Sequence, residues 1–345
     1  MRCAVLGAGG VGLGTAALAA SLGHQVTLWS RGLAAGEGTV ASAGAVEGRF
    51  AVRCAGSRED AAEGADAVVI ALPGWAHRET FEAIGPVLQA GQTVLISSHA
   101  SLGGLYLRRL ARPGVVIVGW GTTVVTGRRV GALAARVSNV RSAVDVAAIP
   151  AGDTAAGLAT CRALFGDRFV ERANLLAVQL SNLNPQNHLA MMLCNLTRAE
   201  RGERWGNYWG VTPAVGRLME ALDAERLALA ARFGASVRTV RQHYALSFQV
   251  PEAPVGEQAA ILDARGGNPD GPDTLDTRYI TEDVPFGIAV TERLGRVAGV
   301  GTPLHTGGAD ILCALMGRDL RAENTLLPAL GLEGVDTAGL LAMVG

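Results

Sequence analysis

Two short polar motifs in the second half of the chain have residue types and spacings that could transfer protons. The first is Asn184-Pro185-x-x-His188. Asn184 and His188 are four residues apart, so they lie on one side of a helix. Pro185 predicts a helix start, for which Asn184 is a natural N-cap. An imidazole titrates near neutral pH, so His188 is the candidate general acid or base.

The second motif covers residues 276–287 and combines an arginine, a carboxylate and a proline. Because proline is tolerated only in the first turn of a helix, Pro285 predicts a helix that begins near Asp283, with Arg278 in the extended segment before it. An arginine beside a helix start is a candidate clamp for a substrate carboxylate. The alternative is a solvated capping cluster with no ligand.

A glycine-rich turn near the N-terminus has the context of a dinucleotide-binding site. The apolar run 3–6 predicts a buried strand, an alanine-rich helix follows as far as Leu22, and residues 25–29 predict a second strand. In this arrangement Gly7 permits the tight turn, Gly9 lets the backbone approach a pyrophosphate, and Gly12 lets the helix pack on the strand. The cofactor-binding residues predicted here are Gly7, Gly9, Gly10, Val11 and Gly12.

The residues after the second strand indicate which nucleotide is bound. A NAD-selective site usually has a carboxylate there, but this strand ends with Ser30 and Arg31, and no acidic residue follows until Glu37. A hydroxyl group and a guanidinium suit a 2′-phosphate. The sequence therefore predicts that NADP(H) is preferred and that NAD(H) is possible. The alternative is that Arg31 stacks on adenine and accepts either nucleotide.

Three further apolar runs, 67–72, 93–97 and 115–118, predict strands buried on both faces of a parallel sheet. Ligands bind outside the carboxyl ends of such strands, so Leu72, Pro73 and Ser97 are expected to approach the cofactor. His77 and His99 lie near the same edge, where a loop histidine is more often a bystander than a catalyst.

Beyond residue 172 the strand-like runs disappear and helical periodicity takes over, as in the stretch capped by Thr212 and Pro213 and ending at Gly234. We expect an α/β protein with an N-terminal Rossmann-type, doubly wound parallel sheet and an all-α C-terminal domain. The predicted domains are residues 1–172, which bind NAD(P), and residues 173–345, which are helical and hold the substrate and catalytic residues.

Composition excludes several classes of function. All 30 basic residues are arginine, so Schiff-base lysines and Walker-type phosphate loops are excluded. The net charge of −1, without any block of like charge, indicates neither a nucleic-acid nor a membrane partner. The five cysteines show no paired spacing, which is typical of reduced cytoplasmic thiols, and the six histidines show no metal-ligand spacing. We expect no metal site.

Taken together, the glycine-rich turn, Asn184-Pro185-x-x-His188, and Arg278-Tyr279 followed by Asp283 make the chain resemble the opine dehydrogenases, the octopine/nopaline dehydrogenase family. The resemblance covers nearly the whole chain. It implies an oxidoreductase that joins an amino acid or amine to a 2-oxo acid and reduces the imine with a nicotinamide hydride. It further implies that His188 and Asp283 form an acid/base pair, that Arg278 holds a carboxylate, and that Asn184 helps to orient the oxo group or the nicotinamide.

Two other functions stay open at this point. One is an imine or 2-oxo acid reductase on the same frame, and the other is a protein that senses NADP(H) without catalysis. The amine site is expected near Tyr208, within the aromatic segment 204–210, although those aromatic residues could equally form core or a dimer surface. A homodimer is expected from the apolar helical domain.

Overall fold

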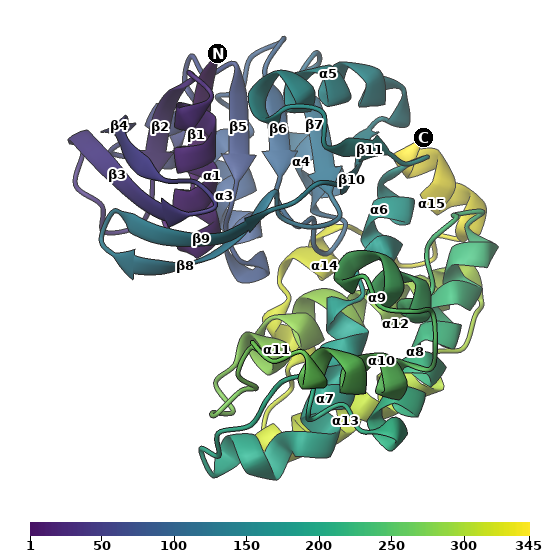
Figure 1. Ribbon diagram of the computed structural model, residues 1–345. Coiled ribbons are helices and arrows are strands. Elements are labelled where there is room, and N and C mark those ends of the chain that lie inside the picture. Colours follow the sequence, from purple (N-terminus) through teal and green to yellow (C-terminus); the bar gives the residue numbers. More distant parts are fainter. The chain divides into compact units, whose positions relative to one another are not determined.

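The computed structural model describes residues 1–345, and the chain forms two compact units. The first consists of Met1–Gln179 together with Leu341–Gly345, and the second of Leu180–Leu340. All strands belong to the first unit, whereas the second is built from helices and loops (Figure 1). The predicted fold class, an α/β part followed by an all-α part, is confirmed.

The first unit contains a single sheet. Its strands are β1 (Arg2–Leu6), β2 (Gln25–Trp29), β3 (Gly36–Gly44), β4 (Gly48–Cys54), β5 (Ala67–Ile70), β6 (Thr93–Ile96), β7 (Val116–Trp120), β8 (Val125–Gly131), β9 (Ala134–Val140), β10 (Val144–Ile149) and β11 (Phe169–Glu171). They lie in the order β11-β10-β7-β6-β5-β1-β2-β4-β3-β9-β8.

The centre of this sheet is the predicted parallel one. β7, β6, β5, β1, β2 and β4 are parallel neighbours, and the order reverses at β1, which lies between β2 and β5. The five predicted strands are therefore confirmed. The sheet is larger than predicted and mixed toward its ends: β3 with β4, β8 with β9, and β10 with β7 are antiparallel pairs, whereas β3 with β9 and β10 with β11 are parallel. β3, β8 and β9 are glycine-containing and half-exposed, so they lack the continuous apolar runs on which the prediction relied. β10 is buried and mostly apolar, but Asp145 interrupts its run.

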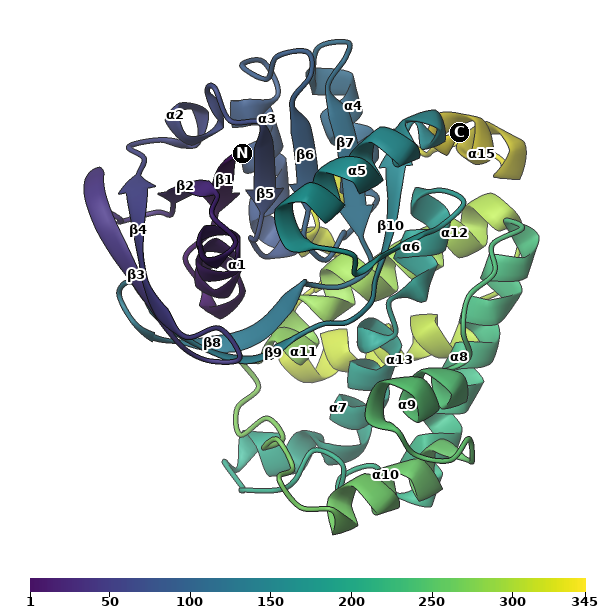
Figure 2. The same ribbon diagram turned by 45° about the horizontal axis from the view of Figure 1, so that its top comes forward.

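Helices cover both faces of the parallel strands. They are α1 (Gly10–Ser21), α2 (Arg58–Ala62), α3 (His77–Ile84), α4 (Gly103–Leu110), α5 (Thr154–Phe165) and α6 (Leu175–Ser181), of which the last runs into the second unit. Figure 2 shows α1 and α5 on one face, α3 and α4 on the other, and β3, β8 and β9 curving around α1.

The composition of α1 follows from this enclosure, because the helix is packed on both sides. A Cβ on Gly14 would lie 3.0 Å from Val125 Cγ2 and 3.1 Å from Val137 Cγ2, and one on Gly10 would lie 2.5 Å from the Gly127 carbonyl oxygen. Larger residues would separate the helix from β8 and β9. The uncharged, glycine-rich start of the chain is thus an interior helix of the α/β unit.

The second unit contains the remaining helices: α7 (Asn184–Glu200), α8 (Pro213–Arg232), α9 (Val240–Phe248), α10 (Val255–Ala264), α11 (Arg278–Thr281), α12 (Ala289–Ala298), α13 (Pro303–Met316), α14 (Leu326–Ala329) and α15 (Thr337–Val344), whose end returns to the first unit. As predicted, Thr212 caps α8, because its hydroxyl accepts a hydrogen bond from Val215 N–H at 3.4 Å. The apolar side of α8 packs into a core with α7 and α13.

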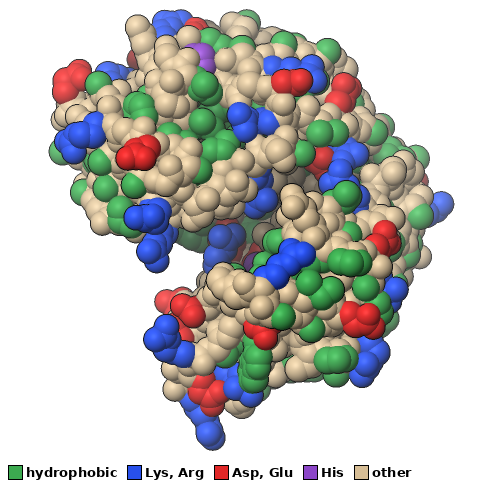
Figure 3. Space-filling model, viewed as in Figure 1, with side chains coloured by type: hydrophobic (Ala, Val, Ile, Leu, Met, Phe, Trp, Pro, Cys, Tyr) green, Lys and Arg blue, Asp and Glu red, His purple; other side chains and the backbone are tan.

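No helix combines the length and the apolar character that crossing a bilayer requires. In the space-filling view, acidic and basic side chains are interspersed over the visible face and no large block has a single sign (Figure 3). This distribution matches the small net charge of the chain.

Candidate active site

The glycine turn after β1 has the backbone geometry that a dinucleotide loop requires. Gly7 has φ +121°, a conformation that L side chains rarely adopt, and a Cβ on Gly12 would collide with the Gly7 carbonyl oxygen. Nothing lies within 4 Å of a Cβ built on Gly9, which is the N-cap of α1 and supplies no side-chain cap. The first-turn N–H groups of α1, at Gly10, Val11 and Gly12, therefore suit a phosphate.

A second feature lies at the carboxyl edge of the parallel strands. Leu72 and Pro73 follow β5, and Ser97 follows β6 with its hydroxyl buried and without a hydrogen-bond partner. Ser98 and Leu102, in the same loop, adopt positive φ values of 59° and 51°, which are strained for residues other than glycine. An orphan hydroxyl and a strained loop at this edge fit a ligand site.

The end of β2 carries more charge than the sequence indicated. Ser30 is half-buried and Arg31 is exposed. Arg31 Nη2 lies 3.5 Å from Oε2 of Glu79, a carboxylate on α3 that reasoning along β2 alone missed. Arg58, at the start of α2, binds the other oxygen of Glu79 at 2.9 Å. Two guanidinium groups thus share one carboxylate where the nucleotide ribose is expected.

His77 and His99 are fully buried within the first unit. His77 Nε2 lies 3.0 Å from the Leu72 carbonyl oxygen, and Gly104 N–H donates to His99 Nε2 at 3.2 Å. Burial lowers the pKa of His77 to about 4, and burial together with the nearby His77 lowers the pKa of His99 to about 3. Both rings are therefore neutral at physiological pH, which fits the bystander role expected for them.

His188 and Asp283 meet in the second unit although 95 residues separate them. His188 Nδ1 lies 2.7 Å from Asp283 Oδ2, and the two side chains are only 14% and 10% exposed. This bond makes Nδ1 the protonated nitrogen of a neutral ring and leaves Nε2 free to exchange a proton with a ligand. The geometry is that of a histidine oriented by a carboxylate.

Tyr279, next to Arg278 in the second motif, packs flat on the His188 ring. The ring centroids are 3.5 Å apart with an interplanar angle of 9°, and Asn207 Nδ2 lies 3.5 Å from the tyrosine hydroxyl. Burial raises the pKa of Tyr279, so its hydroxyl stays protonated at neutral pH. Tyr279 was not among the predicted site residues; its place beside Arg278 is the only signal in the sequence that could have found it.

Arg278 and Asn184 are placed differently from the prediction. Arg278 is the first residue of the short helix α11 and not part of an extended segment, because Thr277 caps a turn there. Its side chain is exposed and forms no ion pair, so its guanidinium is available to an anion. Asn184 is exposed and already inside α7, and it is the Asn182 side chain that accepts the Asn184 N–H, at 3.1 Å.

Tyr208 belongs to an aromatic group beside this site. Its ring meets Phe248 edge-on at 5.7 Å, and burial together with the neighbouring Tyr279 raises its pKa. Trp205, in the same segment, is buried, and a Cβ on Gly271 would lie 2.5 Å from its ring. Trp205 is therefore core, whereas Tyr208 remains a candidate for substrate contact.

Asp283 precedes a π-helical turn, Val284–Ile288, which connects it to α12. Pro285 lies in the first turn as predicted, and Gly287 packs directly on Pro185 at the start of α7: a Cβ on Gly287 would lie 2.5 Å from Pro185 Cβ and closer still to Cγ. This contact between a glycine and a proline lets the segments that carry Asp283 and His188 approach each other.

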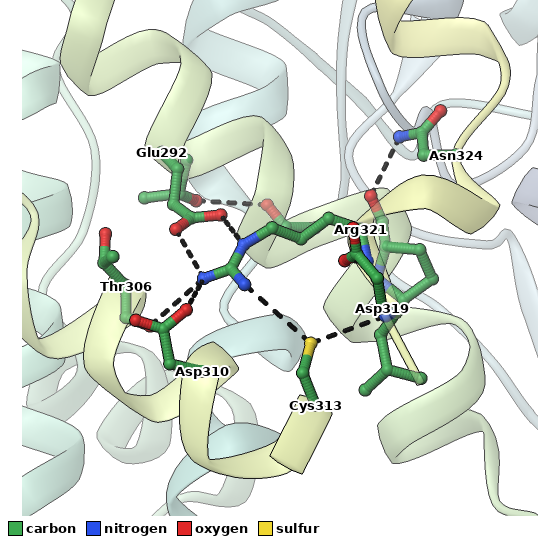
Figure 4. Close-up of polar contacts among 11 residues, drawn as sticks. Glu292, Thr306, Asp310, Cys313, Asp319, Arg321 and Asn324 are labelled. Carbon is green, nitrogen blue, oxygen red and sulfur yellow. Dashed lines mark hydrogen bonds and ion pairs between the residues drawn. The ribbon is translucent and has the colours of Figure 1, made fainter. Parts of the chain in front are cut away.

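Residues that follow α13 form hydrogen bonds and ion pairs with the π-helical turn and with α12. Asn324, 1% exposed, donates from Nδ2 to the Pro285 carbonyl oxygen at 2.8 Å (Figure 4). Arg321 forms a bidentate pair with Glu292 of α12 at 2.7 and 2.9 Å and a further pair with Asp310 at 2.8 Å. The glutamate hydrogen bonds, ahead of the opposing effect of burial, raise the pKa of Arg321. Charge-assisted bonds thus fix the segment that follows Asp283.

The start of α7 is anchored by a buried network. Gln186 Nε2 donates to Asp223 Oδ1 at 2.8 Å, and Arg226, on the same helix as Asp223, donates to that oxygen at 2.7 Å. Val240 N–H donates to the other oxygen at 2.8 Å. Hydrogen bonds to both carboxylate oxygens offset the cost of burying this charge, and the carboxylate holds Gln186, two residues before His188.

Two protein families and a curated relative are similar to this chain. Residues 171–316 match the family described as NAD/NADP octopine/nopaline dehydrogenase, alpha-helical domain, and residues 2–101 match NADP oxidoreductase coenzyme F420-dependent. The opine dehydrogenase of Arthrobacter sp. (strain 1C) is 32% identical over 295 residues, which cover 82% of this chain and 80% of that protein.

Solved structures show the same fold. Octopine dehydrogenase with NADH and L-arginine superposes with a TM-score of 0.80 at 20% identity, covering 99% of this chain and 98% of that one. Yersinopine dehydrogenase with NADP+ gives 0.71 at 15% identity over 96% and 98% of the two chains. By its sequence relationship to the Arthrobacter enzyme, and in accord with the glycine turn and the histidine–aspartate pair, the chain belongs to the opine dehydrogenase family.

Proposed function

We propose that His188 and Asp283 are the acid/base pair of this chain. As a member of the opine dehydrogenase family, the chain is an NAD(P)-dependent oxidoreductase acting on CH–NH bonds, and it joins an amino acid or amine to a 2-oxo acid by reductive condensation. The observation that carries the proposal is the 2.7 Å bond from His188 Nδ1 to Asp283, which leaves Nε2 available beside the exposed Arg278 motif.

Condensation requires a proton at the carbinolamine hydroxyl, which leaves as water when the imine forms. His188 Nε2 first accepts the proton that the amine nitrogen loses when it adds to the oxo carbon, and the imidazolium then delivers that proton to the hydroxyl; the resulting imine carbon is the one that is reduced. Asp283 keeps the imidazole in the tautomer protonated at Nδ1 and stabilises the positive charge that the ring acquires. Tyr279 holds the ring in its plane, and its π face favours the charged imidazolium.

The carboxylate of the 2-oxo acid is assigned to Arg278, which is exposed and unpaired, and Asn184 is assigned to orienting the oxo group. Tyr208 is assigned to the amine. Octopine dehydrogenase structures have been solved with L-arginine, agmatine and pyruvate, and by this similarity we propose an amino acid or amine together with a short 2-oxo acid as the substrates.

The nicotinamide cofactor supplies the hydride when bound. Gly7, Gly9, Gly10, Val11 and Gly12 are proposed to hold its pyrophosphate, and Leu72, Pro73 and Ser97 to line the strand edge beside it; the open space at Gly9 and the orphan Ser97 hydroxyl support this. We propose that NADP(H) is preferred through Ser30 and Arg31.

We propose that residues 1–172 bind the nucleotide and that residues 173–345 bind the substrates, as the predicted domains imply. We further propose a homodimer in the cytoplasm. All five cysteines are free thiols in the structure, which is consistent with a reducing compartment.

The test is oxidation of NADPH and of NADH, followed at 340 nm, with a matrix of 2-oxo acids in the presence and absence of amino acids, with mass spectrometry of the products. We expect oxidation that requires both partners and yields their secondary amine. Oxidation with the carbonyl compound alone would identify a simple reductase. The control is His188→Ala, which should bind NADPH like the parent protein and lose turnover.

A further inference from the structure

The most exposed tryptophan of the chain lies at the edge of the sheet where the nucleotide is expected. Trp75 is 55% exposed and follows β5, in the turn Gly74–Ala76. Arg31, two residues after β2, places its Cζ 5.8 Å from the centroid of the Trp75 ring. Since β1 lies between β2 and β5, the two side chains meet across the carboxyl end of the strand that leads into the glycine turn.

A second pair of arginine and tryptophan lies beside the first. Arg58 Cζ is 4.5 Å from the ring centroid of Trp29, the last residue of β2, and its side chain is only 12% exposed. Its Nε is buried and has no hydrogen-bond partner. Arg58 therefore keeps a directed donor that no protein group uses.

Glu79 is the single carboxylate shared by both arginines, at 2.9 Å from Arg58 and 3.5 Å from Arg31. The Arg58 hydrogen bond, against a smaller effect of burial, lowers the pKa of Glu79, so the group is ionised at neutral pH. Two positive charges against one negative leave these three side chains with a net charge of +1.

We propose that these residues form the adenosine subsite of the cofactor: adenine stacks on Trp75, the 2′-phosphate binds Arg31 and Arg58, and Glu79 is the counter-ion that the phosphate displaces. An exposed indole gives a base a flat stacking surface, and guanidinium groups suit phosphate. This inference rests on the nucleotide preference proposed above: because Glu79 competes with the 2′-phosphate for the arginines, the site prefers NADP(H) but still accepts NAD(H).

The proposal predicts two separable effects on nucleotide affinity. Loss of the Trp75 ring removes stacking, so the affinity for nucleotides with and without the 2′-phosphate falls equally, by about 10-fold or more. Trp75→Phe retains most of the affinity. Loss of Arg31 lowers the affinity only for the 2′-phosphorylated ligand. Glu79→Gln raises the affinity only for that ligand, by about 5-fold, which is the scale of one exposed ion pair.

The experiment is isothermal titration calorimetry of the full chain with adenosine 2′,5′-bisphosphate and with ADP, for the parent protein, Trp75→Leu, Trp75→Phe, Arg31→Ala and Glu79→Gln. Trp209→Leu is the matched control, because Trp209 is 52% exposed and has Arg198 Cζ 4.8 Å from its ring centroid, but belongs to the other unit. Melting temperatures exclude misfolding. Neither ligand carries nicotinamide, so no turnover is involved and the result is independent of the roles of His188 and Asp283.

If Trp75→Leu and Trp209→Leu bind both ligands with equal affinity, the proposal that adenine stacks on Trp75 is wrong. A Glu79→Gln protein that binds adenosine 2′,5′-bisphosphate no better than the parent would overturn the displaceable counter-ion. A loss of affinity for both ligands in Arg31→Ala would move Arg31 from the phosphate to the base.

Discussion

Gly287→Ala tests whether the close packing of two segments creates the His188–Asp283 pair. In most helices the exchange of glycine for alanine is favourable, by about 1 kcal/mol. Here the added Cβ would lie 2.5 Å from Pro185 Cβ. Ordinary carbon–carbon contacts begin near 3.4 Å, so the start of α7 and the π-helical turn must separate by about 1 Å.

A separation of that size is large compared with the geometry it disturbs. The His188 Nδ1 to Asp283 Oδ2 distance of 2.7 Å would become about 3.7 Å, beyond hydrogen-bonding range. A misplacement of about 1 Å at a reacting group typically costs on the order of 100-fold in rate. We therefore expect Gly287→Ala to lower kcat by about 10- to 100-fold, and overpacking to reduce the free energy of unfolding by about 1–3 kcal/mol.

The assay is steady-state turnover together with NADPH affinity and urea unfolding. Gly307→Ala in α13 is the matched control, since nothing lies within 4 Å of a Cβ there and helix propensity alone should make it neutral or stabilising. NADPH binding should be unchanged in both proteins because Gly287 lies in the helical unit. Turnover of Gly287→Ala within twofold of the parent enzyme would refute the packing argument.

Four further predictions concern the side chains themselves. His188→Ala should lower kcat by about 100- to 10,000-fold at unchanged NADPH affinity, and a near-normal kcat would remove it from the mechanism. Arg278→Ala should mainly raise KM for the 2-oxo acid, measured at saturating amine; an unchanged KM would place the clamp elsewhere. Tyr279→Leu should lower kcat about 10-fold and narrow the range of pH over which kcat is high. Tyr279→Phe keeps the aromatic ring, so its kcat and its pH profile should match those of the parent enzyme. Finally, His77 and His99 take up protons with a pKa of 6.5 when unfolded but only at about 4 and about 3 when folded, so stability should fall as the pH drops below 6.5. At pH 5 the loss is about 2 kcal/mol for each histidine, and His99→Gln should show a correspondingly smaller difference in urea unfolding between pH 8 and pH 5.

The sequence predicted those parts of the fold that burial makes visible. Strands β1, β5, β6 and β7 are covered by helices on both faces, so they appear as mainly apolar runs, and Gly7 is needed for a positive φ. The alternating strand β2 was found instead from its place after the glycine turn and the helix. By contrast, β8 and β9 form a hairpin with one face on α1 and arginines on the other. Their pattern does not differ enough from that of a loop to be recognised without the partner helix.

The site shows a similar division between what is encoded locally and what arises from contacts distant in sequence. His188 and Asp283 stand in short motifs and were found, although their pairing came only from the family resemblance, because a 2.7 Å bond across 95 residues leaves no periodic trace. Glu79 was missed because the expected carboxylate was sought after β2, whereas the fold brings one from α3 to the same place. A charge balance read along one strand is therefore incomplete at any point where two strands of a parallel sheet end side by side. At this site the residues that follow β2, β4 and β5 must be counted together, and they give two arginines, Arg31 and Arg58, against Glu79 instead of an unopposed Arg31.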